Sequence, residues 1–397
     1  MRTKALLFFL FALHFVVCSQ EPLCGLGWLE IAEMQKGIPI HEIRASFHNK
    51  LDSAMLHGGN DLNFRSAVTI PVVVHIVWNT PQENLSDGQV LEQIEILNRD
   101  FNSENKDLRD VPEVFKSFIA RKGIRFCLAA ETPDRQPTSG ITRHRTEIEV
   151  VGTKDELYGI APAWDTEIYL NIWVANTGDL LTGFGTYPGL VPPEKQGVVV
   201  HPKYFGNNNS IRYSLGRVAV HEIGHYFGLG HTWGSDEACE TDDDVEDTPL
   251  QQHSYKGCPA HPQASCGSDD MFMNFMDYVD DGCMVMFTQG QMERMLATIE
   301  LFRPGLMDSE IPCIQNTEGI NSEGFTVYPN PASREVKIRF KEPVMTNGWV
   351  SIYNSIGQLV QRDRRVIFDG MTIALLDMPT GIYWIRIGDK SNKIMVR

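Results

Sequence analysis

Three histidines and one glutamate fall within eleven residues of this sequence, at the spacing H-E-x-x-H-x-x-G-x-x-H between His221 and His231. Histidine nitrogens are common zinc ligands, and a glutamate beside the first histidine is placed to act as a base. Three protein ligands leave a fourth position for water, which is typical of a catalytic zinc site. The spacing predicts metal-assisted hydrolysis of a peptide bond, with Zn²⁺ bound by His221, His225 and His231.

A helix accounts for the first two ligands and must end before the third. His221 and His225 are four residues apart, so on a helix they face the same side, one turn apart. On a continued helix the third histidine would lie roughly 240° further around the axis and would miss the metal. Gly228 can take the left-handed conformation that a sharp exit needs. We expect a helix over 214–229, with Ser214 as its N-cap.

Glu222 separates an enzyme from a protein that only carries zinc. It adjoins the ligand His221, where its carboxylate can take a proton from water and later return it. The alternatives are a helix that merely contains histidines, and a surface binding module or adhesin with a structural zinc site. The presence of Glu222 favours the enzyme, with this residue as general base and acid.

Length and composition indicate a globular protein of more than one segment. The chain has 397 residues, of which 42% are hydrophobic and 22% charged. Its formal net charge of −16 disfavours nucleic acid and anionic membranes as partners. Protein or peptide substrates fit this charge and the zinc motif together.

The N-terminus has the pattern of a secretory signal peptide over residues 1–19. Arg2 and Lys4 precede the apolar run 5–17, and cleavage is expected before Gln20. The run is too short to span a membrane, and no later apolar stretch of spanning length follows. Cys18 leaves a lipid anchor as an alternative, although Val17 is a poor neighbour for a lipidated cysteine. Export implies an oxidising compartment, in which disulfides persist.

Residues 20–64 carry no strong structural pattern beyond a short amphipathic stretch, 28–35, and are interpreted as a pro-segment.

The segment that follows, 65–315, combines apolar strands with two long helices, which predicts an α/β (α+β) fold with a mixed twisted sheet above the zinc site. The expected strands are 69–78, 124–129, 167–174 and 197–201, with a glycine-rich rim at 183–189. The expected helices besides the zinc helix follow Ser86 and Thr288, both good N-caps. Between them, residues 232–282 are expected to be mostly loop.

The C-terminal part is expected to be a separate all-β unit. A polar linker, 316–324, precedes short strands divided by proline, glycine and asparagine turns, which predicts a small β-sandwich over 325–397. The expected strands are 325–327, 335–340, 349–353, 358–362, 371–376 and 381–387. No catalytic cluster is evident in this tail.

A methionine about 45 residues after the zinc motif completes the metzincin pattern. The string NFMDYVDDGCMVMFTQGQMERM, from Asn274 to Met295, closely resembles the pappalysin family, and the resemblance extends over roughly 65–301. It implies that Met276 forms a hydrophobic floor beneath the zinc. It also implies that Tyr278 stabilises the tetrahedral intermediate, since a phenol can donate to a developing oxyanion. Simple core packing and a structural tyrosine are the alternatives.

The same resemblance implies a substrate preference. In the bacterial relatives an acidic residue at the position of Asp281 lies at the base of the primed-side pocket and selects Arg or Lys after the scissile bond. A buried carboxylate would do so by charge-assisted hydrogen bonds, strongest with arginine. Asp280 is a competing candidate, and a solvent-facing acid is the alternative for both.

Four cysteines in the loop region allow three disulfide pairings by count alone. The family pattern implies Cys239–Cys266 and Cys258–Cys283, whereas a second zinc site is the rival interpretation. The pairing of the two remaining cysteines, at positions 127 and 313, stays open.

The acidic sequence from Asp243 to Pro249 resembles the family's calcium loop. Carboxylate, carbonyl and hydroxyl oxygens suit Ca²⁺, which takes six to eight oxygen ligands. The candidate ligands are Asp243, the Val245 carbonyl and Thr248, with Asp247 as a further one. A solvated acidic loop is the alternative.

Cys24 is the most informative residue of the pro-segment. A thiolate is a good zinc ligand and can take the position of the catalytic water, as related bacterial precursors do in a cysteine switch. Disulfide pairing and an idle thiol are the alternatives. Cleavage before a basic residue makes Phe64–Arg65 the favoured self-cleavage site, with Arg44 and Lys50 as earlier candidates.

The tail resembles the C-terminal sorting domain of the type IX secretion system of Bacteroidetes. The resemblance is carried by Tyr328-Pro329-Asn330-Pro331, by the string from Tyr353 to Gln358, and by the string from Pro379 to Tyr383. It implies passage through the outer membrane by that machinery, to a secreted or surface-associated location. Whether the tail is then removed stays open. A carbohydrate-binding sandwich is the runner-up, but the sequence shows no evident exposed aromatic platform.

Overall fold

The computed structural model describes residues 23–57, 68–121, 123–207, 212–213, 215–234, 239–314, 324–341 and 344–397. The expected signal peptide, 1–19, the cleavage site Phe64–Arg65 and nearly all of the expected linker, 316–323, lie outside the described residues. Within the described ranges, no helix is long and apolar enough to cross a membrane.

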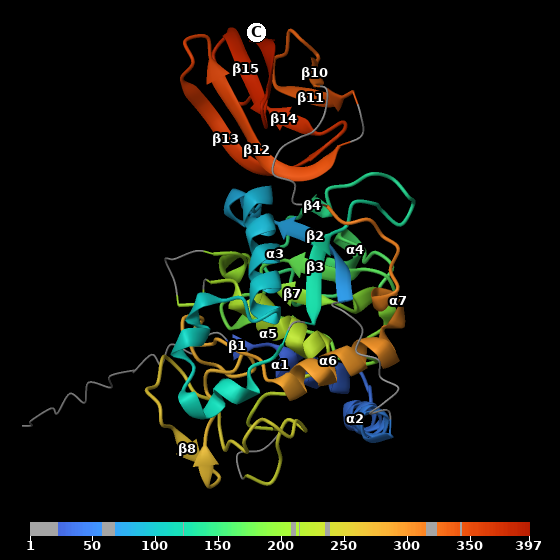
Figure 1. Ribbon diagram of the computed structural model, residues 1–397. Helices are drawn as coiled ribbons and strands as arrows, with labels where there is room; N and C mark the ends of the chain where they lie inside the picture. The colour runs from blue at the N-terminus through green and yellow to red at the C-terminus, as the bar shows by residue number, and fades with distance from the viewer. Residues whose placement is uncertain are drawn as a thin grey trace, which may run out of the picture.

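A seven-stranded mixed sheet lies in the middle of the molecule in Figure 1, below the C-terminal strands and above α5 (Arg217–Tyr226). Its order is β1-β6-β7-β5-β2-β3, with β4 also paired to β2. The bounds are β1 Leu23–Cys24, β2 Val68–Trp78, β3 Ile124–Leu128, β4 Ile141–Arg145, β5 Leu170–Val174, β6 Leu181–Gly185 and β7 Val198–Val200. Strand β6 runs antiparallel to β7, and the other pairs are parallel. Strand β2 is buried along nearly all of its length, as a central parallel strand should be.

The predicted α/β class is confirmed, with one difference at the lower edge of the sheet. The sequence predicts a glycine-rich rim at 183–189, but residues 181–185 form the strand β6. The strand forms despite its glycines, because the missing side chain of Gly185 lets β6 lie close to the zinc helix. A Cβ on Gly185 would overlap the carbonyl oxygen of Glu222 on the zinc helix, so the strand can lie against that helix only without a side chain.

The two expected capped helices form, and the first of them packs on β3 of the sheet. Helix α3, Asp87–Phe101, begins at Ser86, whose hydroxyl accepts from the Gln89 backbone N–H in a capping box. Helix α6, Gln289–Phe302, begins at Thr288 with the same arrangement. Short helices α4, Glu156–Ile160, and α7, Pro304–Met307, complete this part.

The zinc helix is shorter than expected. Helix α5 spans Arg217–Tyr226, and its N-cap is Gly216 rather than Ser214, which lies outside the described residues. Gly216 has a left-handed backbone, with φ of 76°, and provides no side-chain cap. Instead, the Asp281 carboxylate accepts from the backbone N–H groups of Leu215 and Arg217. The predicted N-cap is therefore wrong, because a cap from a distant segment replaces a local one.

The N-terminal segment contains two helices, of which the sequence pattern indicates only part of the first, the amphipathic stretch 28–35. Helix α1 spans Leu26–Gln35, and α2 spans Ile40–His57, where the sequence shows no strong pattern. Among the side chains of α2 up to residue 56, those of Ile40, Phe47 and Leu51 are buried. Polar and charged side chains fill most of the positions between them, which is why the apolar pattern is weak. Helix α2 packs against α6, as Figure 1 shows.

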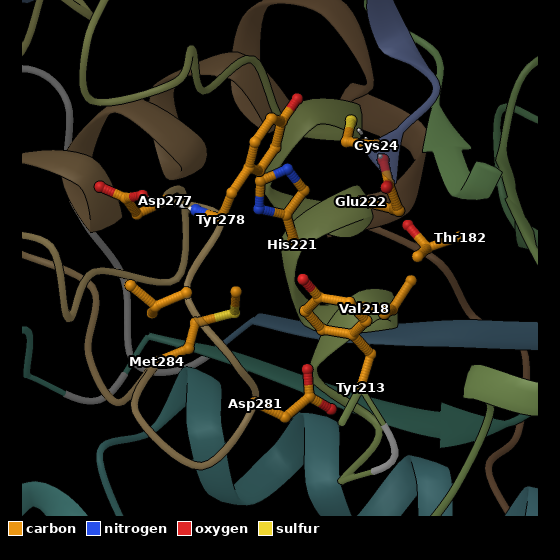
Figure 2. A pocket seen from close by; sticks show the side chains of 11 residues that line it. Cys24, Thr182, Tyr213, Val218, His221, Glu222, Asp277, Tyr278, Asp281 and Met284 are labelled. Atoms are coloured by element: carbon orange, nitrogen blue, oxygen red, sulfur yellow. Dashed lines mark hydrogen bonds between the residues drawn. The ribbon is translucent and has the colours of Figure 1, made fainter. Parts of the chain in front are cut away.

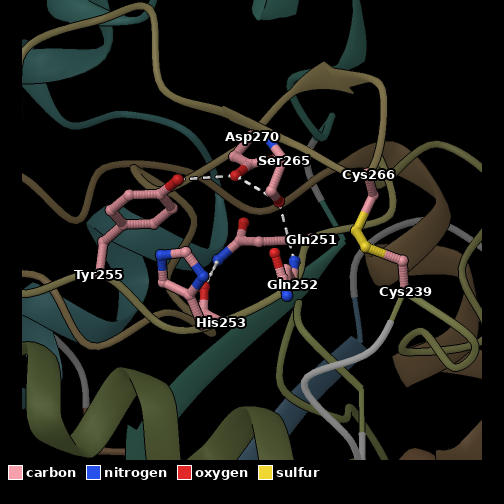
Figure 3. The surroundings of a disulfide bond; sticks show 8 residues. All are labelled: Cys239, Gln251, Gln252, His253, Tyr255, Ser265, Cys266 and Asp270. Atoms are coloured by element: carbon pink, nitrogen blue, oxygen red, sulfur yellow. Dashed lines mark hydrogen bonds between the residues drawn. A yellow bond between two sulfur atoms is a disulfide. The ribbon is translucent and has the colours of Figure 1, made fainter.

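The lower part of the catalytic segment is mostly loop, as predicted, and is held by disulfides. Two short strands, β8 Ala264–Ser265 and β9 Ser268–Asp269, form a hairpin there. Disulfides join Cys239 to Cys266 and Cys258 to Cys283, the pairs that the family pattern implies. Figure 3 shows the first of them beside a polar cluster, in which the Tyr255 hydroxyl donates to Asp270. A third disulfide, Cys127–Cys313, joins β3 to the segment after α7.

The tail is an all-β sandwich of two antiparallel sheets next to α3 (Figure 1). One sheet has the order β10-β11-β14 and the other β13-β12-β15-β16. The bounds are β10 Phe325–Tyr328, β11 Glu335–Phe340, β12 Met345–Asn354, β13 Leu359–Phe368, β14 Thr372–Ala374, β15 Gly381–Ile387 and β16 Lys390–Val396. Strand β16 is not among the strands that the sequence predicts. Trp349 and Trp384 are exposed on this tail.

Candidate active site

The three histidines of the motif converge on one point. His221 and His225 extend from α5, and His231 follows the turn at Gly228, whose φ of 85° takes the chain out of the helix. The Nε2 atom of His225 lies 3.1 Å from the Nε2 atoms of both other histidines. Nitrogens bound at 2.0–2.1 Å to one tetrahedral ion lie about 3.3 Å apart, so the spacing suits a single zinc ion.

Backbone carbonyls orient two of these imidazoles. The Nδ1 atom of His221 contacts the Phe275 carbonyl at 2.7 Å, and that of His225 contacts the Leu229 carbonyl at 2.8 Å. A carbonyl accepts only, so each Nδ1 carries the proton and each Nε2 directs its lone pair at the common point. Burial lowers the pKa of His221 to about 4, and lowers those of the other two further below their usual range. Neutral imidazoles with converging lone pairs repel one another unless a cation lies between them.

Glu222 lies on the sheet side of this cluster and is fully buried. Its Oε2 atom accepts from the Cys24 thiol at 3.5 Å, and Oε1 has no hydrogen-bond partner among the described residues. Burial raises the pKa of Glu222 to about 8, which places this carboxyl close to the range where it can exchange a proton near neutral pH.

Cys24 lies beside the cluster as part of a strand pair. Strand β1 adds to the edge of the sheet along β6, with Cys24 opposite Gly183, and the Gly25 N–H donates to the Gly183 carbonyl at 2.7 Å. The Cys24 sulfur and the three histidine nitrogens all lie within 4.8 Å of one another. Burial and the neighbouring Glu222 raise the pKa of this thiol, so a thiolate here requires a cation in the cluster.

The segment after the loop region brings a methionine and a tyrosine to the cluster. Met276 is fully buried beneath α5, where its sulfur would lie 2.5 Å from a Cβ placed on Gly224. Tyr278 lies on the other side, with its ring centroid 5.0 Å from that of His231. Burial raises the pKa of Tyr278 well above its usual value, so its hydroxyl stays protonated and can donate.

Trp233 is a site residue that the motif does not predict. Its ring stacks on His231 at a centroid distance of 4.3 Å and an interplanar angle of 6°. It also contacts the ring of Tyr278 at 4.7 Å. The signal available in the sequence is its position, two residues after the last ligand, where any side chain must lie close to the metal centre.

A pocket opens beside His221 and Glu222 (Figure 2). Its walls are largely apolar: Tyr213, Val218, Val279 and Met284 contribute side chains. In Figure 2, Asp281 lies at the end of this pocket away from Cys24 and Glu222. Asp280 does not line the pocket and instead pairs with Arg212 at 2.5 Å.

Asp281 is held at this end with one oxygen fixed and one free. Its Oδ2 atom accepts from Leu215 N at 2.8 Å and from Arg217 N at 3.2 Å. Its Oδ1 atom is buried and has no partner among the described residues. Burial raises the pKa of Asp281 to about 6, and the two backbone N–H groups act in the opposite direction. The cap of α5 uses the Oδ2 atom of Asp281 and gives no role to its Oδ1 atom.

The four candidate calcium ligands also lie together. Asp243 is buried, and Thr248 contacts both its Oδ1 atom at 2.6 Å and the Val245 carbonyl at 2.7 Å. Asp247 accepts from the Gly290 N–H at the start of α6. One oxygen of each aspartate is buried and has no partner among the described residues. Burial raises the pKa of Asp243 to about 7, and the hydrogen bond from Thr248 acts in the opposite direction.

The comparisons with known proteins identify the class of this site. The profile of the Peptidase_M43 family, described as pregnancy-associated plasma protein-A, matches residues 155–300. An extracellular metalloprotease of Arthroderma benhamiae is 27% identical over 291 residues, covering 71% of this chain and 96% of that protein. One from Arthroderma gypseum is 29% identical over 261 residues, covering 63% and 79%. The class is that of secreted zinc metalloendopeptidases.

Solved structures narrow this class to one family. Mature mirolysin of Tannerella forsythia, in complex with a cleaved peptide, is 38% identical, with a TM-score of 0.57 over 61% of this chain and 99% of that chain. A promirolysin mutant from the same organism is 34% identical, with a TM-score of 0.63, covering 72% and 97%. The chain belongs to the pappalysin family of zinc metalloendopeptidases. Residues 326–397 match the secretion system C-terminal sorting domain, so the protein is an exported one with a sorting tail.

Proposed function

We propose that this secreted metalloendopeptidase cleaves peptide bonds before Arg or Lys, and that its precursor is kept latent by Cys24. The single observation that carries the proposal is the pocket beside the three histidines. It has apolar walls along its length and ends at a buried carboxylate with a free oxygen.

The donor set fits one Zn²⁺ ion. His221, His225 and His231 supply three neutral nitrogens whose lone pairs converge, and their spacing agrees with tetrahedral geometry. A zinc ion bound there would polarise the scissile carbonyl and make water acidic enough to attack near neutral pH. Met276 supports α5 from below and thereby holds two of these ligands in place.

The proton transfers fall to Glu222. Its carboxylate would take a proton from the attacking water and deliver it to the leaving amine, which is general base and then general acid catalysis. Its free oxygen is available to water once Cys24 has left. Tyr278 keeps its proton and would donate a hydrogen bond to the oxygen that becomes negative in the tetrahedral intermediate.

Specificity would follow from the shape and charge of the pocket. Tyr213, Val218 and Met284 suit the aliphatic part of a long side chain, and the free Oδ1 atom of Asp281 suits a cation at its end. An arginine forms the stronger charge-assisted hydrogen bonds, and a lysine the weaker ones. Asp280 is the poorer candidate because Arg212 already pairs with it.

Latency would require that Cys24 and the chain around it occupy the substrate's place. Strand β1 pairs with β6 beside the zinc ligands, so the edge that could hold a substrate's backbone is taken. The segment has further anchors: Phe47 packs on Phe302 at 4.8 Å, and Asp52 pairs with the buried Arg294 at 2.9 Å. The similarity to a promirolysin, which covers more of this chain than the mature form does, supports a precursor of this kind.

Calcium would hold the loop beneath the site. Asp243, the Val245 carbonyl, Asp247 and Thr248 offer hard oxygen donors, and two buried oxygens among them lack partners within the described part of the chain. Removal of calcium, or the substitution Asp243→Asn, should lower the melting temperature by about 5 °C, measured by differential scanning calorimetry. Mg²⁺ should restore little of it, and an unchanged transition would refute the site.

The division of the chain follows from this scheme. We assign 1–19 to a signal peptide, 20–64 to the pro-segment, 65–315 to the catalytic domain, 316–324 to a linker and 325–397 to the sorting domain. The sorting tail supports export through the type IX machinery of a Bacteroidetes-type bacterium. N-terminal sequencing of the mature enzyme tests the boundary, because self-cleavage at Phe64–Arg65 predicts Arg65 as its first residue.

The test of the basic preference compares two peptides that differ only after the scissile bond. One carries arginine and the other citrulline, which has nearly the same shape without the charge. The mature enzyme should cleave the arginine peptide with a kcat/KM about 10- to 100-fold higher. Equal values would overturn the assignment of Asp281 while leaving the class of the enzyme intact.

A further inference from the structure

A buried arginine lies directly behind Asp281 and yet does not pair its side chain with the Asp281 carboxylate. Arg217 is 2% exposed and begins helix α5. Its Nη1 atom donates to the backbone carbonyl of Asp281 at 2.6 Å, and its backbone N–H donates to Oδ2 of the same residue. Its guanidinium is therefore close enough to neutralise the charge that would bind a basic substrate.

Two other aspartates hold this guanidinium. Its Nε atom lies 3.1 Å from Oδ2 of Asp100 on α3, which is fully buried. Its Nη2 atom lies 2.6 Å from Oδ2 of Asp107, whose side chain is 27% exposed. Every nitrogen of the guanidinium thus donates to a named acceptor, and none of these acceptors is the Asp281 carboxylate. The planar fork of an arginine fixes such a set of directions.

The two arginines and three aspartates around Arg217 carry a net negative charge. Asp100 also accepts from Arg99, at 2.7 and 3.1 Å, so this carboxylate is shared between two arginines. Arg99 and Arg217 supply two positive charges, and Asp100, Asp107 and Asp281 supply three negative ones. The surplus negative charge is assigned to Asp281, which lines the pocket and whose Oδ1 atom has no partner among the described residues.

We propose that Asp100 and Asp107 are positioning residues for substrate specificity: by holding Arg217, they keep the Asp281 carboxylate charged and free to bind a basic side chain. The inference rests on the proposed function, because it explains how the basic pocket keeps its charge beside a buried cation. Arg217 in turn fixes the loop that carries Asp281, through the backbone carbonyl.

Several carboxylates compete for one guanidinium in this cluster. If Asp100 loses its charge, the Nε atom of Arg217 loses its partner, and the neighbouring carboxylate that Arg217 does not already bind through its side chain is that of Asp281. Pairing there would neutralise the pocket, since a buried cation without a full partner is costly. The same substitution leaves His221, Glu222 and the apolar walls in place, so the reaction on a neutral substrate should continue.

The test uses the mature enzyme and the arginine and citrulline peptides. Asp100→Asn should lower the ratio of kcat/KM for arginine over citrulline by about tenfold, mainly through a higher KM for the arginine peptide. Asp107→Asn, at a partly exposed position, should lower it in the same direction and serves if Asp100→Asn does not fold. Arg99→Gln is the matched control, because it leaves Arg217 fully held, and its ratio should stay within about twofold.

A rescue variant separates specificity from a structural effect. The double substitution Asp100→Asn with Arg217→Gln removes the competing cation but also the donor to the Asp281 carbonyl, so recovery should be partial, to within about threefold of the wild-type ratio. A purely structural role predicts instead that both peptides suffer equally and that the double variant is worse. An unchanged ratio in folded Asp100→Asn and Asp107→Asn enzymes, or no rescue, would overturn the inference.

Failure of the underlying function would look different. If the wild-type enzyme itself cleaves both peptides equally, the basic pocket is wrong and the inference falls with it. If the wild type prefers arginine and the Asp100 and Asp107 variants keep that preference, the pocket stands and only the role of these aspartates is refuted.

Discussion

The two ends of one pocket each contain a fully buried carboxylate, and their surroundings suit different tasks. Glu222, beside the histidines, and Asp281, at the far end, each keep one oxygen without a partner among the described residues. Burial raises both pKa values, to about 8 for Glu222 and about 6 for Asp281. The two carboxyl groups are equally buried, yet their pKa values differ.

The difference lies in what each carboxylate accepts. Asp281 accepts two backbone N–H groups at the start of α5, where the helix dipole also favours negative charge. Glu222 accepts from the Cys24 thiol, and one backbone group, that of Gly185, also lowers its pKa, but burial outweighs both. A carboxyl group that must exchange protons and one that must stay charged are thus separated by their hydrogen-bond donors.

Glu222→Ala should give the largest effect. Without a group to move protons, kcat/KM on casein or a peptide should fall by about 10³-fold, while folding and zinc binding persist. Zinc content per chain, measured by atomic absorption, and circular dichroism are the controls. Cleavage of casein at the wild-type rate would contradict the mechanism and would restore the idea of a purely structural zinc.

Asp281→Asn should change which peptides are cut more than how fast. The neutral amide loses the charge-assisted bond to the substrate, so the preference for arginine over citrulline should drop by about 10- to 100-fold. The rate on the citrulline peptide should change little. Asp280→Asn is the matched control, and the contrast between the two ends of the pocket fails if this neighbouring substitution has the same effect.

Cys24→Ala tests whether the zinc end of the pocket is blocked in the precursor. Loss of the sulfur should raise the initial rate of the uncut precursor on a small peptide by about tenfold, because water can then enter. The rate must be taken before any chain cleavage is visible on a gel. Latency equal to that of the wild-type precursor would rule out the switch.

The pH dependence should show the smallest effect and should be confined to basic substrates. The raised pKa of Asp281 means that its carboxyl is charged above about pH 6 and becomes protonated as the pH falls through that value. The arginine preference in kcat/KM should therefore decline between about pH 7 and pH 5. The ratio should be independent of pH in Asp281→Asn, and a parallel decline in that variant would assign the effect to another group.

The sequence predicts most of the zinc end and little of the other end. The ligands His221, His225 and His231 lie within eleven residues: helical periodicity brings the first two together, and the turn at Gly228 brings the third to them. Tyr278 and Asp281 require the family pattern, because nothing local joins them to α5.

Residues far apart in the chain explain what the sequence does not predict. Arg217 and Asp100 are 117 positions apart, and no spacing rule links two such residues. The cap of α5 comes from Asp281, 64 positions after Arg217, which is why the local candidate Ser214 is wrong. Helix α2 escapes prediction because its stability depends on packing against α6 and not on a strong pattern of its own.

The most direct test of the proposed enzyme is a map of the bonds that its mature form cuts in a denatured protein mixture, with and without a zinc chelator. We predict cleavage before arginine and, less often, before lysine, abolished by the chelator and restored by Zn²⁺. Cleavage that persists without zinc, or cut sites not enriched in a basic residue after the bond, would contradict the proposed function.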